Sequence, residues 1–148
     1  MAHVTEIKVR GYHLDLYGHV NNARYLEFFE EARWAWLEQH LDVQAFQNQG
    51  LGFVAVRIAV NYRRPAALGE VLAVSSQLKH LGGRSGVVEQ FVHRRDGGEL
   101  VADAEMTFVV LDLAQGKAVP LEGAVRRQFE RAQEAASAAG VPPTRPAS

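Results

Sequence analysis

The stretch GYHLDLYGHVNN, residues 11–22, is the part of the chain around which the predicted fold is organised. It carries two histidines, two tyrosines, two glycines and one aspartate, and it separates a strand-like segment, residues 3–10, from the longest helical pattern. Asn21 or Asn22 suits the N-cap of that helix, because an asparagine oxygen accepts a hydrogen bond from an unpaired backbone N–H. Asp15 lies seven residues before Asn22, a spacing that can return its carboxylate toward the first helical turn.

An apolar stripe runs along the predicted helix. Residues at about 3.6 per turn share one face, and that face consists of Tyr25, Leu26, Phe29, Ala32, Trp36 and Leu37. The opposite face is charged, with Arg24, Glu27, Glu31 and Glu38. Trp34 falls on this polar side. It could be a lone exposed aromatic residue, it could contact a second subunit, or it could line a ligand channel.

Four strands are expected after the helix. Residues 53–62 alternate in polarity, which predicts one face made of Val54, Val56, Ile58, Val60 and Tyr62. Three further strands are predicted over residues 70–81, 84–95 and 99–113. Short glycine-containing turns join these three strands, so they should form an antiparallel meander.

Two more helices are predicted, over residues 42–49 with Asp42 as the cap and over residues 121–139. One strand, a long helix and four strands in this order indicate a two-layer α+β domain. We expect residues 1–140 to form a single domain and residues 141–148, which contain three prolines, to be a flexible tail.

The composition narrows the function classes. The chain has 148 residues, 47% of them hydrophobic and 22% charged, which is ordinary for a soluble globular protein. A net charge of -1 disfavours nucleic-acid binding, and no apolar run is long enough for a membrane span. There is no cysteine, which removes disulfides, thiolate metal sites and cysteine nucleophiles. The N-terminus lacks a signal-peptide pattern, so a cytoplasmic protein is expected.

Asp15 is the first candidate for chemistry. The unpaired N–H groups at a helix start carry partial positive charge and can polarise a carbonyl oxygen. A carboxylate beside them can act as a nucleophile or as a base toward water, which suits attack on a thioester. Three alternatives stay open. Asp15 could be only a helix cap or turn former, and His13, Asp15 and His19 could together bind a metal. His19 could also be a general acid or base, or a residue that shapes the loop.

The residues of this loop resemble those of a known family. VRGYHLD, residues 9–15, and HVNNARYL, residues 19–26, are similar to the hotdog-fold acyl-CoA thioesterases, relatives of 4-hydroxybenzoyl-CoA thioesterase. NYRRPA, residues 61–66, and ADA, residues 102–104, are similar too. The likeness runs from about residue 5 to residue 129 and is greatest to the bacterial long-chain acyl-CoA thioesterase III subgroup.

This resemblance implies an antiparallel sheet wrapped around one long helix, and a homodimer or homotetramer with active sites at the subunit interface. It implies hydrolysis of acyl-CoA, with medium to long fatty acyl chains, and no metal or redox cofactor. Asp15 is then the nucleophile or general base, and the backbone N–H of Asn22 polarises the carbonyl. Five residues are assigned to substrate binding, namely His19, Asn21, Arg63, Arg84 and Ser85.

The assignment of Arg84 and Ser85 also rests on the residues themselves. The turn GGRSG, residues 82–86, could hold a phosphate through backbone N–H groups, the hydroxyl and the guanidinium. A glycine turn with a solvated arginine is the competing interpretation. Arg63 and Arg64 could likewise meet an anionic ligand or be solvated.

Two other functions remain possible from the sequence. A hotdog hydratase or dehydratase would carry a histidine five residues after the aspartate and an Asn-Pro pair, whereas His19 lies four residues after Asp15 and the Asn-Pro is absent. A non-catalytic acyl-CoA-binding module is the second alternative, and the presence of Asp15 speaks against it.

Overall fold

A computed structural model describes residues 3–139. The elements in chain order are β1 (His3–Lys8), the short 3-10 helix η1 (Gly11–His13), α1 (Asn22–His40), α2 (Val43–Asn48), β2 (Leu51–Tyr62), β3 (Val71–Leu81), β4 (Ser85–Arg94), β5 (Leu100–Asp112), β6 (Lys117–Ala118) and α3 (Gly123–Ala139). The predicted helices and strands are confirmed, while η1 and the two-residue β6 were not predicted. The expected tail, residues 141–148, lies outside the described residues.

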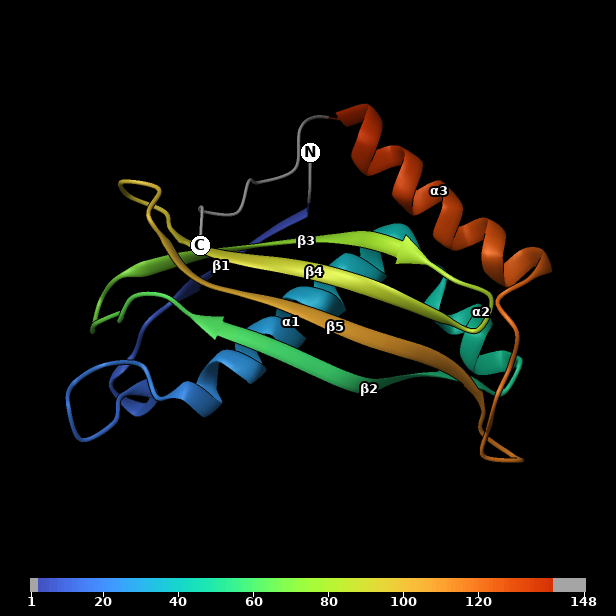
Figure 1. The fold of residues 1–148 in the computed structure, drawn as a ribbon, viewed down its shortest axis with the longest axis horizontal. Helices are drawn as coiled ribbons and strands as arrows, with labels where there is room; N and C mark the ends of the chain where they lie inside the picture. Colours follow the sequence, from blue (N-terminus) through green and yellow to red (C-terminus); the bar gives the residue numbers. More distant parts are fainter. Residues whose placement is uncertain (1–2, 140–148) are drawn as a thin grey trace.

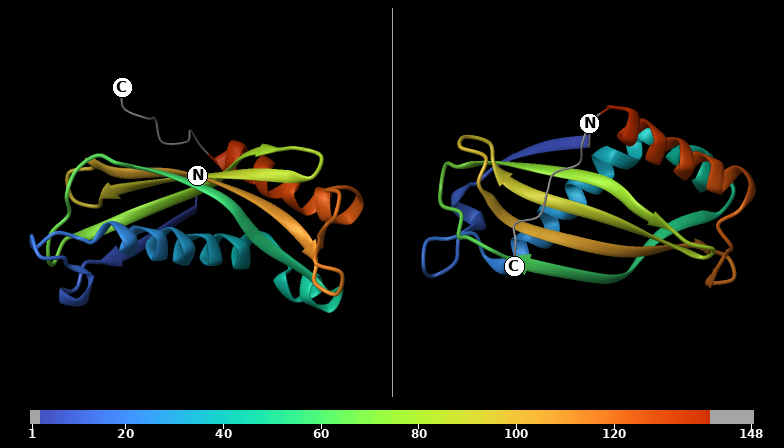
Figure 2. Two further views of the ribbon diagram at one scale, coloured as in Figure 1. Left: turned by 60° about the horizontal axis from the view of Figure 1, so that its bottom comes forward. Right: turned by 45° about the horizontal axis from the view of Figure 1, so that its top comes forward.

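The sheet is antiparallel throughout the described chain, with the order β1-β3-β4-β5-β2 and β6 beside β5. The three strands β3, β4 and β5 are neighbours, so the predicted meander is confirmed. The sheet curls, and α1 lies along one of its faces (Figures 1 and 2). The two-layer α+β architecture is therefore the one that the sequence predicts.

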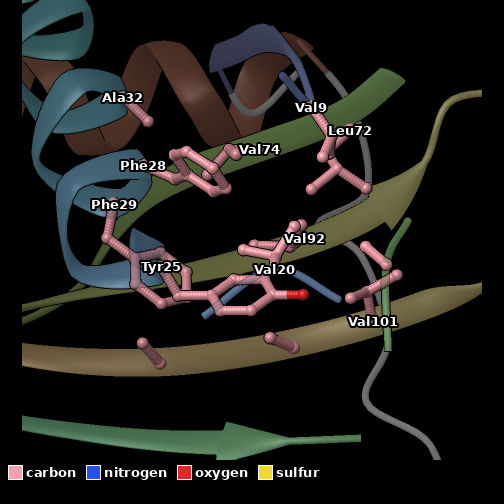
Figure 3. Close-up of a cluster of buried hydrophobic side chains, with 13 residues drawn as sticks. Val9, Val20, Tyr25, Phe28, Phe29, Ala32, Leu72, Val74, Val92 and Val101 are labelled. Atoms are coloured by element: carbon pink, nitrogen blue, oxygen red, sulfur yellow. The ribbon is translucent and has the colours of Figure 1, made fainter. Parts of the chain in front are cut away.

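The start of helix α1 is fixed by its N-cap residue. The Asn21 side-chain oxygen accepts a hydrogen bond from the Ala23 N–H at 2.9 Å, which makes Asn21 the N-cap. Tyr25, Phe29 and other residues of one face are buried against the sheet, and the complete set is Tyr25, Phe28, Phe29, Ala32 and Trp36. Figure 3 shows Tyr25 and Phe28 pointing from α1 toward Val74 and Val92.

The predicted apolar stripe is wrong at two positions. Leu26 is exposed, and Phe28, which the prediction left out, is buried. The reason is that the buried face is centred on Tyr25, Phe29, Ala32 and Trp36, and Phe28 lies on one edge of it. Leu26 lies on the flank of the helix, about a quarter turn away.

Strand β2 also departs from prediction. A bulge between Ala55 and Arg57 breaks the alternation, so Val54 and Val56 do not continue the face of Ile58. Residues paired across strands share a face, and Ala55 pairs with Phe108, whose side chain is buried. The side of β2 that faces α1 therefore consists of Phe53, Ala55, Ile58, Val60 and Tyr62.

The core has two parts, one at each end of α1. The first surrounds Tyr25 and Phe28, and the second contains Trp36, Phe46 from α2 and Phe129 from α3. α3 and α2 thus close the end of the sheet that the N-terminal half of α1 does not cover. Within residues 3–139, no helix combines the length and the apolar character that crossing a membrane requires.

Candidate active site

The loop before α1 is held by its own backbone. The Asp15 N–H donates to the His19 carbonyl at 2.8 Å, and the Gly18 N–H donates to the Asp15 carbonyl at 3.1 Å. Gly18 has a φ of 76°, a left-handed conformation that glycine adopts without steric cost. His19 also forms a β-bridge with Ala67, which ties the loop to the segment after β2. The loop is a defined turn rather than a loose connection.

Within this turn the Asp15 carboxylate is fixed on one side only. Its Oδ1 accepts hydrogen bonds from the Tyr17 N–H at 2.9 Å and from the His19 N–H at 3.3 Å. No donor within residues 3–139 is bonded to Oδ2. The turn therefore orients the carboxylate and leaves its second oxygen available, and the same bonds show that Asp15 is also a turn former.

The start of α1 supplies a free donor. The Asn21 N–H donates to the His13 carbonyl, the Ala23 N–H to Asn21 Oδ1 and the Arg24 N–H to the Asn21 carbonyl. Within the described part of the chain, the N–H of Asn22 has no acceptor. An N–H at the first helical position carries partial positive charge, so it can polarise a carbonyl oxygen that is placed on it.

Asp15 and this helix start line the same hollow. The hollow has a volume of about 490 Å³ and is lined by Asp15, His19, Val20, Asn21, Asn22, Tyr25, Tyr62, Arg63, Arg64 and Pro65. Five of the seven residues that the sequence analysis assigned to catalysis or binding therefore come together, namely Asp15, His19, Asn21, Asn22 and Arg63. Their roles stay predictions.

Arg84 and Ser85 lie elsewhere in the chain. Arg84 lies in the turn between β3 and β4, and Ser85 begins β4, at the end of the sheet opposite the Asp15 loop (Figure 1). This turn is tied to the start of α3, because the Leu121 N–H donates to the Gly83 carbonyl at 2.7 Å. Within one chain these two residues are not part of the hollow.

Two residues that support the hollow were not singled out from the sequence. The Tyr62 hydroxyl donates to the Asn22 carbonyl at 2.8 Å and so joins the end of β2 to the start of α1. Asp103 is buried and accepts from Asn61 Nδ2 at 2.9 Å and from Arg63 Nε at 2.7 Å. These three bonds join residues 40 to 42 positions apart in the chain. Tyr62 and Asp103 lie in the stretches NYRRPA and ADA that carry the family resemblance, but no local pattern marks the bonds themselves.

His13 and His19 have different surroundings. His13 is buried, packs edge-on against Phe28 and accepts a hydrogen bond from the Arg10 N–H at Nδ1, at 2.8 Å. Burial lowers the pKa of His13. His19 is exposed at the edge of the hollow. Residues 3–139 contain no group of three or more His, Cys, Asp or Glu side chains arranged to hold a metal.

The curled sheet, the long α1 and the hollow at its start are those of a hotdog-fold thioesterase. The chain belongs to the Thioesterase-like superfamily, whose sequence pattern matches residues 9–129. It is 52% identical over 127 residues to the long-chain acyl-CoA thioesterase FadM of Escherichia coli K12, covering 86% of this chain and 96% of that protein. It is 30% identical to the acyl-CoA thioesterase YbgC of Haemophilus influenzae over 78% of this chain and 85% of that protein.

Solved structures agree. The crystal structure of YbaW, a probable thioesterase from Escherichia coli, superposes with a TM-score of 0.83 at 51% identity, covering 88% of this chain and 98% of that one. The protein SAV2348 from Staphylococcus aureus, solved in complex with CoA, superposes with a TM-score of 0.81 at 13% identity. The match covers 90% of this chain and 85% of that one. At that identity the second likeness concerns the fold alone.

Proposed function

We propose that this chain hydrolyses acyl-CoA thioesters, with medium to long fatty acyl chains, to the free acid and coenzyme A. The observation that carries the proposal is that Asn22, whose N–H has no acceptor in the described part of the chain, lines the same hollow as Asp15. The 52% identity to a long-chain acyl-CoA thioesterase supports the substrate class. A cytoplasmic location stays a prediction from the sequence.

In this mechanism the thioester carbonyl oxygen binds to the Asn22 N–H. The partial charge of the helix start stabilises the negative charge that develops on that oxygen when the carbonyl carbon is attacked. Asp15 either attacks the carbon itself and expels the coenzyme A thiolate, leaving an acyl anhydride for water to hydrolyse, or it takes a proton from the attacking water. Asn22 acts through its main chain, so its side chain is not required for this step.

Substitution of Asp15 by asparagine tests the proposal. The asparagine oxygen can still accept from the Tyr17 and His19 N–H groups, so the turn is kept, but the amide is neither a base nor a comparable nucleophile. We expect kcat for thiol release from palmitoyl-CoA to fall at least about 100-fold, with an unchanged melting temperature. A folded Asp15→Asn variant with wild-type activity would refute the proposed role of Asp15.

We further infer that the protein is a homodimer or homotetramer that pairs through β2. This strand has the outer edge of the sheet free within the described chain, and Val56 and Ile58 on it are exposed. Such edges pair readily with a second chain. Two β2 strands paired antiparallel about a two-fold axis would bring the β3–β4 turn of one protomer toward the Asp15 end of its partner. Arg84 and Ser85 could then serve the partner's hollow as the coenzyme A site.

A charge on the edge tests this assembly. Val56→Lys places an ammonium group where two strands would meet, and we expect it to elute as a monomer in gel filtration. The monomer should also lose activity, because the sites are proposed to lie at the interface. A wild-type protein that elutes as a monomer would contradict the inference.

A further inference from the structure

A second hollow lies at the other end of α1. Its volume is about 350 Å³, and it is enclosed by the second half of α1, by α2, by the start of β2 and by side chains of β5 and α3. The lining is mainly aromatic and aliphatic, with Trp34, Leu37, Phe46, Phe53, Met106 and Phe108. We call this hollow the distal pocket. It shares no lining residue with the hollow at Asp15.

Both hollows open along one flank of α1, the flank that faces β2. At one end, Asn22 is bonded to Tyr62. At the other end, Leu37 and Phe53 line the distal pocket together. Leu26 lies one turn after Asn22, and Leu37 follows Leu26 by eleven positions, which is about three turns, so the three positions form one stripe on the helix surface.

The stretch between the two hollows is apolar. Leu26 of α1 is 42% exposed and Ile58 of β2 is 38% exposed, although both belong to elements packed on the core. Ile58 lies on the α1-facing side of its strand, with Val60 and Tyr62. An apolar strip thus leads from the proposed carbonyl position at Asn22 to the distal pocket.

The distance along this strip sets a chain length. At 1.5 Å per residue, Glu30 at the near side of the distal pocket lies about 12 Å from Asn22, and Leu37 at the far side lies about 22 Å away. An extended chain advances about 1.2 Å per bond, as three backbone bonds span at most about 3.6 Å. An acyl chain therefore needs about ten bonds to reach the pocket and about eighteen to cross it.

Two charged residues line the pocket: Glu30 is exposed to solvent, and Arg33 is held by a buried network. It donates to Gln90 Oε1 at 3.1 Å, and Gln90 Nε2 in turn donates to the Phe29 carbonyl and to Ser76 Oγ, each at 2.9 Å. Because its guanidinium group is bonded to Gln90, Arg33 can line the pocket with its aliphatic stem. The charge of Arg33 is thereby compatible with an apolar occupant of the pocket.

We propose that the distal pocket binds the methyl end of the acyl chain and makes the enzyme select for length. This rests on the proposed acyl-CoA hydrolysis. Chains of about eight carbons end before the pocket, and chains of about sixteen enter it. Each methylene that leaves water for the pocket strengthens binding about fourfold, so kcat/KM should rise steeply once the chain is long enough to enter.

Ala55 is a small residue on the β2 side of the pocket. It pairs with Phe108, shares its face of the sheet and lines the pocket. A larger side chain at this position would occupy the space in which the chain end is proposed to lie. Ala59 is a matched control, because it is an alanine of the same strand that pairs with Glu105 and points to the opposite face.

The experiment measures kcat/KM for octanoyl-CoA and palmitoyl-CoA, both below their micelle concentrations, in the wild type, Ala55→Phe and Ala59→Phe. We expect Ala55→Phe to lower kcat/KM for palmitoyl-CoA at least tenfold, which corresponds to the loss of about two buried methylenes at fourfold each. For octanoyl-CoA the change should stay within about twofold. Ala59→Phe should leave the ratio of the two substrates unchanged.

Trp34→Ala gives a second test on the helix side. Trp34 is 46% exposed, so its removal costs little stability, and the loss of this wall should also lower the ratio of palmitoyl-CoA to octanoyl-CoA activity. If Ala55→Phe does not fold, Trp34→Ala decides alone. If a folded Ala55→Phe variant keeps the wild-type ratio of palmitoyl-CoA to octanoyl-CoA activity, the proposed role of the distal pocket is refuted. If Ala55→Phe does not fold, an unchanged ratio in Trp34→Ala refutes it. A wild type that releases no thiol from either substrate overturns instead the proposed function itself.

Discussion

The Tyr62 hydroxyl donates a hydrogen bond of 2.8 Å to the Asn22 carbonyl. This bond joins the last residue of β2 to the first residue of α1, which lines the hollow of Asp15 and whose N–H has no acceptor among residues 3–139. Tyr62 also packs edge-on against Tyr25, and burial raises the pKa of its hydroxyl, which therefore stays protonated and able to donate. The position of the free N–H thus depends on the end of a strand.

Tyr62→Phe should therefore impair catalysis more than stability. The ring contact with Tyr25 is kept, and the loss of one partly exposed hydrogen bond should lower the free energy of unfolding by about 1 kcal/mol. We expect kcat for palmitoyl-CoA to fall about tenfold, because a less firmly held helix start aligns the N–H less well with the carbonyl. Urea unfolding and steady-state kinetics measure the two effects. A variant that is destabilised but keeps its kcat would show that the bond is structural only.

Asn21→Ala, in contrast to Tyr62→Phe, should mainly lower stability, because it weakens the start of α1. It removes the side-chain oxygen that caps the Ala23 N–H, which should cost about 1 kcal/mol of unfolding free energy. Asn21→Asp keeps an oxygen acceptor at the same place and should recover most of that loss. The midpoint of urea unfolding distinguishes the two variants, and equal midpoints would mean that the cap contributes nothing.

Features of the fold that depend on neighbours in sequence could be predicted. The helix start at Asn21, the cap at Asp42 and the meander of β3 to β5 follow from capping chemistry, apolar spacing and glycine turns. The return of Asp15 toward α1 also follows from a short loop. These are interactions over a few residues, for which the chain itself fixes the geometry.

Features that depend on packing could not be predicted in this way. Leu26 and Phe28 are both apolar, so hydrophobicity alone does not tell which of them is buried. That depends on which flank of α1 packs against the sheet. The bulge after Ala55 changes the face of half of β2 without any glycine or proline to mark it. The bonds of Tyr62 and Asp103 to the site join distant segments, so their roles appear only when the sheet is assembled.

The pair of Arg63 and Asp103 predicts a large stability effect. Nε of Arg63 lies 2.7 Å from the Asp103 carboxylate, whose side chain is 1% exposed. Arg63→Met leaves this carboxylate buried with Asn61 as its remaining partner among the described residues, and breaking a buried pair in this way costs about 3 kcal/mol or more. Chemical denaturation measures the loss.

The double variant Arg63→Met with Asp103→Leu is the control. It removes both charges, and it should be more stable than Arg63→Met alone, because no buried charge is left without a partner. If the single and the double variant are equally destabilised, the side chain of Arg63 stabilises the protein by packing and not by neutralising Asp103.

Stability should also fall in mild acid because of His13. Burial lowers the pKa of His13 from its ordinary value of 6.5, so the unfolded chain binds a proton at a higher pH than the folded protein does. The stability that the neutral ring contributes is present above pH 6.5 and is lost as the pH falls below it toward the folded pKa. Burial also lowers the pKa of His40 and His93, so all three act in the same direction.

His13→Asn isolates the share of this one residue. The asparagine oxygen can accept from the Arg10 N–H in place of Nδ1, and it does not titrate. We expect the variant to be less stable than the wild type at pH 7.5, since the contact with Phe28 is reduced, but to lose less stability between pH 7.5 and pH 5. Melting temperatures across this range measure both slopes. Equal slopes would mean that His13 takes up its proton equally well in the folded and unfolded chain, contrary to its burial.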